Sequence, residues 1–275
     1  MESYLFYAIA AAAVWYFGVP LLIKQNLRIN SRPALTPVTP TNLPDDAQEY
    51  FNAAAPAMQS LGFEKSVCFI MDNSVPGVTP HVQMWMNHKT GQCATANVII
   101  SKSGGKPPTI KKHVEFLTKI AGGMAIMTNN SHELGAFKKT NASDTLSATR
   151  LADITHLYRL HTWRDAKLAG ESAPRFLPNP GSEMQWFGDA NQESIERQVA
   201  TGYLQQDASD PSIYTPTVTG AYMMTWSQQW PMKSMRRSSE DKRAESQIRE
   251  AIAAKIAPPS SVRITSDRPP ARKAA

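Results

Sequence analysis

The chain has 275 residues, of which 42% are hydrophobic and 19% are charged, a composition typical of a globular protein. Twenty prolines and fourteen glycines occur without a fixed period, which excludes collagen-like and repeat architectures. Two cysteines are too few for a disulfide-stapled scaffold. The formal charge of +6 comes from residues 233–275, which hold eleven Lys and Arg against five Asp and Glu, while the first 232 residues are neutral.

The N-terminus contains a run of twenty uncharged, mostly apolar residues, Tyr4 to Ile23, between Glu2 and Lys24. At ~1.5 Å per residue a helix of this length spans the ~30 Å hydrocarbon layer of a bilayer. A cleaved signal peptide would need a positively charged start, and the chain begins Met-Glu-Ser. The run therefore predicts a single transmembrane helix, with residues 1–23 as an uncleaved membrane anchor that contacts lipid through residues 4–23.

Three cations, Lys24, Arg28 and Arg32, follow this run, and the next acidic residue is Asp45. Because Lys and Arg flanking a membrane segment stay on the cytoplasmic side, this pattern places the remainder of the chain in the cytoplasm. We expect a single-pass protein of a plasma or inner membrane with a cytoplasmic C-terminal domain.

Residues 24–44 contain four prolines and no helical or alternating apolar pattern, which predicts an extended linker. A helix is then expected from Asp45 to Gly62, with acids in its first turn and glycine at its end.

An antiparallel meander of about five strands is expected next, because apolar and polar residues alternate and Gly-containing turns separate the runs. His113 and Glu115 of the fourth strand are expected on a solvated sheet face. A long helix is expected to start at Ser143, end near Leu168 and cover the sheet. The fold class is thus α+β, with residues 45–170 as the sheet domain. The expected strands are 66–72, 80–87, 92–101, 112–120 and 123–129.

Residues 171–257 are expected to form a helical C-terminal subdomain, and residues 258–275 a disordered basic tail. Helices are expected from Asn191, between Pro216 and Pro231, and from Ser239 to Ile256.

His161 and Asp165 are four residues apart on one expected helix, so the carboxylate could orient the imidazole as a general base. No serine or cysteine in a nucleophile turn accompanies them, and we favour a structural helix-internal pair. His156 and His161 are five apart, about 140° around the helix, which does not suit a shared metal ion. We expect neither a metal nor a cofactor.

Residues 220–237 are the strongest indication of a partner. An aromatic stripe leads into cations at the end of an expected helix, a pattern that suits an interfacial helix on an anionic membrane or a protein-binding surface. The alternative is the buried face of an ordinary core helix. Nucleic acid is a poor candidate partner, because acidic residues interleave the basic ones. The residues concerned are Tyr222, Trp226, Trp230, Lys233, Arg236 and Arg237.

These observations favour a membrane-anchored, non-enzymatic accessory or tethering protein that binds other membrane-complex subunits or the membrane surface. A membrane-tethered sensory or small-molecule-binding module is the first alternative, and it needs an apolar pocket lined by Val82, Met84, Met86 and Leu157. A hydrolase or transferase that uses the histidine–aspartate pair is the second, and it needs that pair to open into a cleft.

Overall fold

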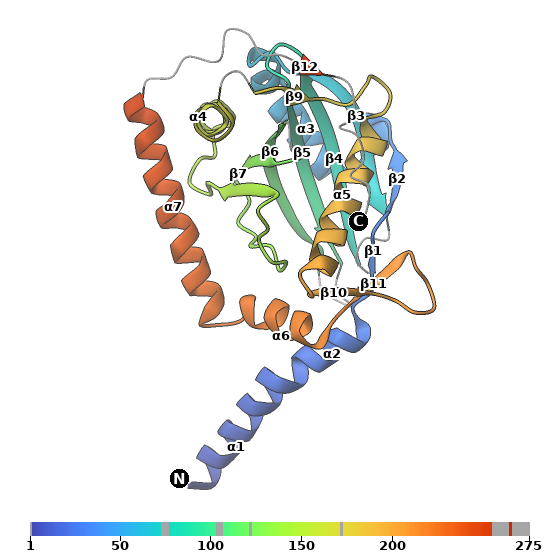
Figure 1. Cartoon of the computed structure of the whole chain (residues 1–275), viewed down its shortest axis with the longest axis vertical. Coiled ribbons are helices and arrows are strands. Elements are labelled where there is room, and N and C mark those ends of the chain that lie inside the picture. Colours follow the sequence, from blue (N-terminus) through green and yellow to red (C-terminus); the bar gives the residue numbers. More distant parts are fainter. Residues whose placement is uncertain are drawn as a thin grey trace. The chain divides into compact units, whose positions relative to one another are not determined.

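The computed structural model describes residues 2–72, 77–102, 107–120, 123–170, 173–254 and 264–265. It confirms the α+β class with a mostly antiparallel sheet (Figure 1). The chain forms two compact units that are discontinuous in sequence, whereas the predicted domains were contiguous. Unit 1 comprises residues 1–33, 133–139 and 188–239, and unit 2 comprises residues 34–132, 140–187 and 240–275.

Unit 2 is built on one large sheet, in which β3, β4, β5 and β6 each pair antiparallel with the next strand along the chain. The predicted five-strand meander is therefore confirmed. Further strands extend it: β2 pairs with β3, β8 lies parallel to β7, and β9 pairs with the end of β6 and with β12. The strands are β2 (Ala34–Pro37), β3 (Glu64–Asp72), β4 (Val78–Asn87), β5 (Gln92–Ser101), β6 (Thr109–Ile120), β7 (Ala125–Asn129), β8 (Ser143–Ser147), β9 (Arg175–Phe176) and β12 (Ile264–Thr265).

Two helices, α3 (Asp45–Ser60) and α4 (Ile154–Ala169), bury their apolar sides in the main core on one face of this sheet. The predicted first helix is confirmed, with Pro56 inside it and Gly62 beyond its end at a φ of 81°. Glycine tolerates this conformation without the Cβ clash that other residues meet. The opposite face carries a second cluster, which includes Met84 and the Phe187 side chain near the start of α5.

The helix predicted to start at Ser143 begins eleven residues later, at Ile154. Residues 143–147 form β8 instead, and Leu146 of this strand is fully buried in the main core. The side chain that caps α4 is Asp153, which accepts a hydrogen bond of 2.8 Å from the amide of His156. Serine and aspartate are both favoured N-caps, so the serine pattern alone misplaced the start.

The Pro-rich residues 24–44 are largely extended, but they are paired to the rest of the chain. After α2 ends at Asn26, β1 (Ile29–Asn30) pairs with β11 in unit 1, and β2 pairs with β3 in unit 2. Pro37 lies in β2, which is the edge strand, where a missing amide donor is tolerated. The predicted linker is thus part of both sheets.

Unit 1 combines helices with a small antiparallel sheet of strand order β1-β11-β10. Its core contains Ile29, Ile195, Leu204, Tyr214 and Met224. Helices α5 and α7 each begin in one unit and end in the other. The remaining elements of the chain are α1 (Glu2–Ala13), a π-helical turn η1 (Val14–Gly18), α2 (Val19–Asn26), the 3-10 turn η2 (Pro40–Asn42), α5 (Glu183–Ala200), β10 (Leu204–Gln206), β11 (Ile213–Pro216), α6 (Val218–Ser227) and α7 (Met232–Ala254).

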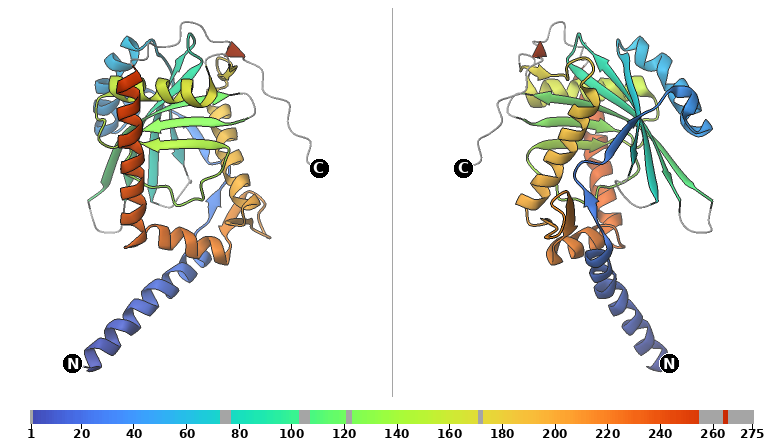
Figure 2. Two further views of the ribbon diagram at one scale, coloured as in Figure 1. Left: turned by 60° about the vertical axis from the view of Figure 1, so that its left-hand side comes forward. Right: turned by 90° about the vertical axis from the view of Figure 1, so that its right-hand side faces the viewer.

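Within the residues described, no helix combines the length and the apolar character that crossing a membrane requires. The predicted run 4–23 is helical, but it is divided among α1 of 12 residues, the π-helical turn of five and α2. The single transmembrane helix is therefore not supported. In both views of Figure 2, α1 projects beyond the other elements of unit 1. The predicted disordered tail lies outside the described residues, apart from the two residues of β12.

The second half of α7 is attached to the rest of unit 2 by ion pairs and by Ala244, Ile248 and Ala251, which pack in or against the main core. Arg243 contacts Asp144 at 2.6 Å, Lys167 contacts Glu250 at 2.6 Å, and Arg150 pairs with Glu245. Among its described residues, only Ala244 is buried.

We predict that Gly220→Ala destabilises the protein. A Cβ at this position of α6 would lie 1.8 Å from the carbonyl oxygen of Tyr203, and backbone must move to relieve the clash. Overpacking of this kind costs about 1–3 kcal/mol. Thermal unfolding should show a lower midpoint for this variant. Gly135→Ala, where an added Cβ meets nothing within 4 Å, is the control, and equal midpoints for the two variants would contradict the expectation.

Candidate membrane-contact surface

The segment predicted to contact a membrane or a partner, residues 220–237, forms most of α6 and the start of α7. The side chain of Thr217 caps α6 by accepting a hydrogen bond of 2.9 Å from the amide of Gly220. Four residues, 228–231, separate α6 from α7. We call residues 228–235 the α6–α7 junction.

The aromatic stripe of α6 packs on the N-terminal helical segment, a contact that the sequence did not predict. The indole nitrogen of Trp226 donates a hydrogen bond of 2.9 Å to the carbonyl of Tyr16, and the Tyr222 hydroxyl donates one of 3.2 Å to the carbonyl of Phe17. The Phe17 and Trp226 rings meet edge to face at 6.5 Å. The Tyr16 hydroxyl donates in return to the carbonyl of Trp230. The three aromatic residues of the predicted contact set therefore make contacts inside unit 1.

These contacts fall on the π-helical turn, Val14–Gly18. A π-helical turn widens the helix, and such turns often mark functional positions. Here the turn presents the carbonyls of Tyr16 and Phe17 to donors on α6. Pro20, in the following α2, is buried, so the second part of the N-terminal segment belongs to the folded unit.

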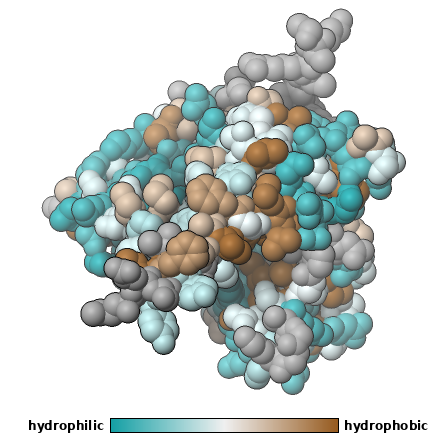
Figure 3. All heavy atoms as spheres, turned by 90° about the horizontal axis from the view of Figure 1, so that it is seen from below, coloured by the Kyte–Doolittle hydropathy of each residue, from teal (hydrophilic) through white to brown (hydrophobic). Residues whose placement is uncertain are grey.

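The first part of the segment and the α6–α7 junction remain uncovered. Val14 is 71% exposed, Trp230 76% and Met235 62%. Figure 3 looks at the side on which Figure 1 places α1, α2 and α6, and brown side chains gather in the centre of this view. Contiguous exposed apolar surface of this kind marks interaction sites. The other large exposed apolar residues of these elements are Tyr4, Leu5, Phe6, Tyr7, Trp15, Phe17, Leu21, Leu22, Val218, Met223 and Met232.

The flanking cations differ in their availability. Arg28 pairs with Asp207, and Arg32 lies 3.7 Å from Asp189. Hydrogen bonds from the Ser209 hydroxyl and amide, and then from Arg28, lower the pKa of Asp207, which keeps this carboxylate charged. Lys24, in the last turn of α2, makes no ion pair with the residues that the structure describes.

The junction cations also differ. The Arg236 guanidinium donates to the carbonyls of Ser227 at 3.1 Å and Gly135 at 2.9 Å, which fixes it inside unit 1. Arg237 is half-buried and also has an interaction partner. The Lys233 ammonium is exposed, with no partner in the described part of the chain.

The catalytic alternative for His161 and Asp165 needs the pair to open into a cleft, whereas both side chains are buried and bonded to other partners. Both ring nitrogens of His161 bond to threonine hydroxyls, Nε2 to Thr118 and Nδ1 to Thr128, each at 3.0 Å. The imidazole is 0% exposed and stacks on Phe116. Burial, with help from two nearby arginines, lowers the pKa of His161 to about 3. A neutral, fully enclosed imidazole supports the fold and has no path to a substrate.

Asp165 instead belongs to a buried ion pair. Arg175 donates from Nε at 3.0 Å and from Nη2 at 3.2 Å to the two carboxylate oxygens, and Gln92 adds a third bond at 2.8 Å. Gln92 in turn accepts a hydrogen bond from the Tyr158 hydroxyl. Such multiply bonded carboxylate–guanidinium pairs offset the cost of burying two charges and fix one arrangement of the chain.

The residues proposed to line a ligand pocket lie in two separate, buried clusters. Val82, Met84 and Met86 pack with Phe69 on one face of the sheet, whereas Leu157 belongs to the core on the other face. All four proposed lining residues are at most 3% exposed.

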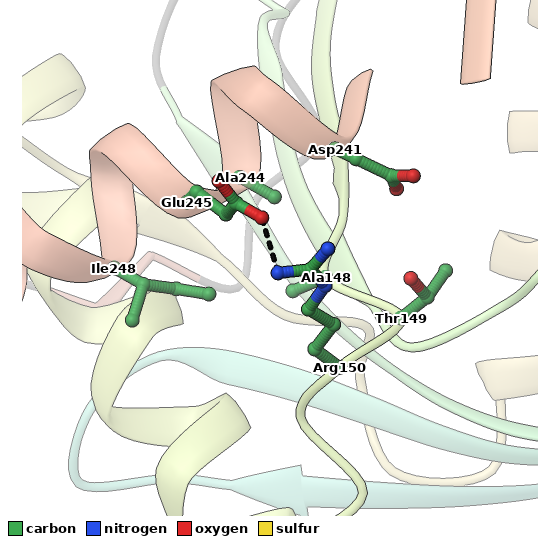
Figure 4. A pocket seen from close by; sticks show the side chains of 7 residues that line it. All are labelled: Ala148, Thr149, Arg150, Asp241, Ala244, Glu245 and Ile248. Atoms are coloured by element: carbon green, nitrogen blue, oxygen red, sulfur yellow. Dashed lines mark ion pairs between the residues drawn. The ribbon is translucent and has the colours of Figure 1, made fainter. Parts of the chain in front are cut away.

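One shallow surface pocket lies elsewhere, between α7 and residues 148–150 (Figure 4). The Arg150–Glu245 ion pair crosses it. The described residues thus give the small-molecule hypothesis no support.

A row of polar residues across β5, β6 and β7 is more buried than the solvated face that we expected for His113 and Glu115. Thr95, Glu115 and Asn129 are register partners on β5, β6 and β7, and Asn129 donates to Glu115 at 3.0 Å. Burial raises the pKa of Glu115 and lowers the pKa of neighbouring His113 to about 4. The alternating pattern placed these side chains on one face of the sheet, but it did not indicate that this face is largely buried.

Comparison of the chain with protein-family models, with curated proteins and with solved structures found no match.

We predict that Arg175→Met destabilises the protein strongly, because it leaves the Asp165 carboxylate buried without its counter-charge. Loss of one partner of a buried pair typically costs about 3–5 kcal/mol. The double variant Arg175→Met/Asp165→Leu should recover most of this loss in chemical denaturation. A double variant as unstable as the single one would show that the pair itself, and not the orphaned charge, governs stability.

We predict that His161 makes the protein acid-sensitive. Its pKa is about 3 in the folded state and about 6.5 in an unfolded chain, so only the unfolded state takes up this proton between these values. Its contribution to stability is complete above pH 6.5 and is lost as pH falls towards 3, at up to about 1.4 kcal/mol per pH unit. His161→Gln should flatten the fall in unfolding free energy between pH 6.5 and 4, whereas His88→Gln, at an exposed turn, should not. Equal slopes for the two variants would contradict this assignment.

Proposed function

We propose that the chain is a non-enzymatic accessory protein held at a membrane by its N-terminal helical segment, so that its folded units act as a tether for other proteins there. The observation that carries this proposal is a projecting helix, α1, and a π-helical turn whose large apolar side chains are exposed. Leaving such side chains in water costs about 1.5–3 kcal/mol each, and lipid removes this cost.

The attachment of this helix to the folded protein supports tethering. The segment does not end in a free hinge, because Tyr16 and Phe17 accept hydrogen bonds from α6 and Pro20 is buried. Insertion of the segment would therefore hold unit 1 directly at the bilayer.

The charge pattern supports the cytoplasmic side of a plasma or inner membrane. No acidic residue occurs between Ser3 and Pro44, a stretch that contains Lys24, Arg28 and Arg32. The cytoplasmic leaflet carries anionic lipids, which attract such basic segments. Arg28 and Arg32 already pair with carboxylates, so Lys24 is the cation of the three best placed to meet lipid phosphate.

The accessory role rests on the enclosed polar groups of unit 2. The only histidine–aspartate pair that the sequence offered as catalytic is buried and occupied by other partners. The proposal accordingly assigns this unit to binding proteins at the membrane.

Val14→Arg tests the attachment in the full-length protein. A charge in a membrane-embedded helix costs up to about 2.5–3.5 kcal/mol at the centre of the bilayer and less towards its surface, so this variant should show reduced co-flotation with zwitterionic liposomes. Ile252→Arg is the matched control, because Ile252 is 73% exposed on α7, outside unit 1. Thermal unfolding should confirm that both variants fold. Undiminished flotation of Val14→Arg would contradict attachment through this segment.

A further inference from the structure

We propose that the α6–α7 junction rests on the surface of an anionic lipid bilayer, beside the point where the N-terminal helix enters it. This inference rests on the proposed function and adds a second, specific contact to it.

The junction has the side chains of an interfacial segment. Trp230, Met232 and Met235 expose large apolar groups within six residues, and the exposed Lys233 ammonium stands among them. Tryptophan is enriched where hydrocarbon meets headgroups, because its ring is apolar and its N–H is polar. Lysine at the same level reaches lipid phosphate while its methylene stem stays in apolar surroundings.

The junction is continuous with the exposed N-terminal surface. The Tyr16 hydroxyl donates to the carbonyl of Trp230, and the Trp226 indole donates to the carbonyl of Tyr16. These bonds place the junction next to the π-helical turn, where Val14 and Trp15 are exposed. A bilayer that receives α1 therefore meets the junction as well.

The charge of the junction and of the N-terminal segment favours an anionic lipid surface as the binding partner over an uncharged surface. Residues 211–239 contain no Asp or Glu, and neither do residues 3–44. Together the two stretches carry six Lys and Arg: Lys24, Arg28, Arg32, Lys233, Arg236 and Arg237. Arg28 and Arg32 pair with carboxylates of the chain, whereas Lys24 and the exposed Lys233 have no ion-pair partner among the described residues, so these two lysines are the cations that an anionic leaflet attracts most directly.

The test places an environment-sensitive fluorophore at Met235→Cys of the full-length protein, with Ser234→Cys as the matched control. The two positions are adjacent on α7, both exposed, and about 100° apart around the helix. Cys68 and Cys93 are 6% and 1% exposed, and burial raises the pKa of both thiols, so labelling selects the introduced cysteine.

On vesicles containing phosphatidylserine, the label at Met235→Cys should shift to shorter wavelength and become several-fold less accessible to aqueous iodide than the label at Ser234→Cys. If the protein floats with the vesicles but both labels stay equally accessible, the inference is overturned and the proposed function stands. If the unlabelled protein does not float with any vesicles, the proposed function fails and the inference fails with it.

Lys233→Glu tests the charge separately. This variant should partition onto phosphatidylserine vesicles roughly fivefold less well or worse, because each basic residue near the surface contributes a factor of about this size. Its partition onto purely zwitterionic vesicles should not change. Equal partition of wild type and Lys233→Glu onto anionic vesicles would show that the junction does not meet anionic lipid.

Discussion

Two backbone carbonyls, those of Tyr16 and Phe17, determine how this chain can use its apolar N-terminus. They accept hydrogen bonds from Trp226 and Tyr222 of α6, at a π-helical turn inside the N-terminal helix. A carbonyl that bonds outside its own helix joins that helix to another element. The apolar segment is consequently a rigid part of unit 1, and where the segment goes, α6 and the start of α7 must follow.

Unit 2 depends on a different kind of constraint, a set of enclosed polar groups beneath α4. Asp165, Arg175 and Gln92 satisfy one another, while His161 is held between two threonines. Each bond requires its partners in one register, so α4 cannot slide on the sheet without leaving a buried charge or donor unpaired. His161 and Asp165, the candidate catalytic residues of the sequence, thus determine how α4 packs on the sheet.

Local pattern predicted most of unit 2. Alternation of apolar and polar residues, with glycine at the turns, located β3 to β7 within a few residues, and the acids and glycine around α3 located that helix. Elements that depend on distant partners were missed: β2 within the Pro-rich segment, and β8, which is short and parallel to β7. For the candidate surface, the aromatic spacing of α6 predicted a contact of Tyr222 and Trp226 without indicating its partner. It could not show that they bond 205 and 210 positions away, because nothing local in the sequence records such a contact.

Helix α7 differs from the sheet in the kind of contact that holds it in place. Its second half is held to unit 2 by ion pairs of Arg243, Glu245 and Glu250, and its apolar residues Ala244 and Ile248 pack in or against the main core. Coulombic attraction between exposed groups weakens as dissolved ions screen it, whereas apolar packing does not. Raised ionic strength therefore weakens the ion pairs of α7 more than it weakens the apolar packing of the sheet core.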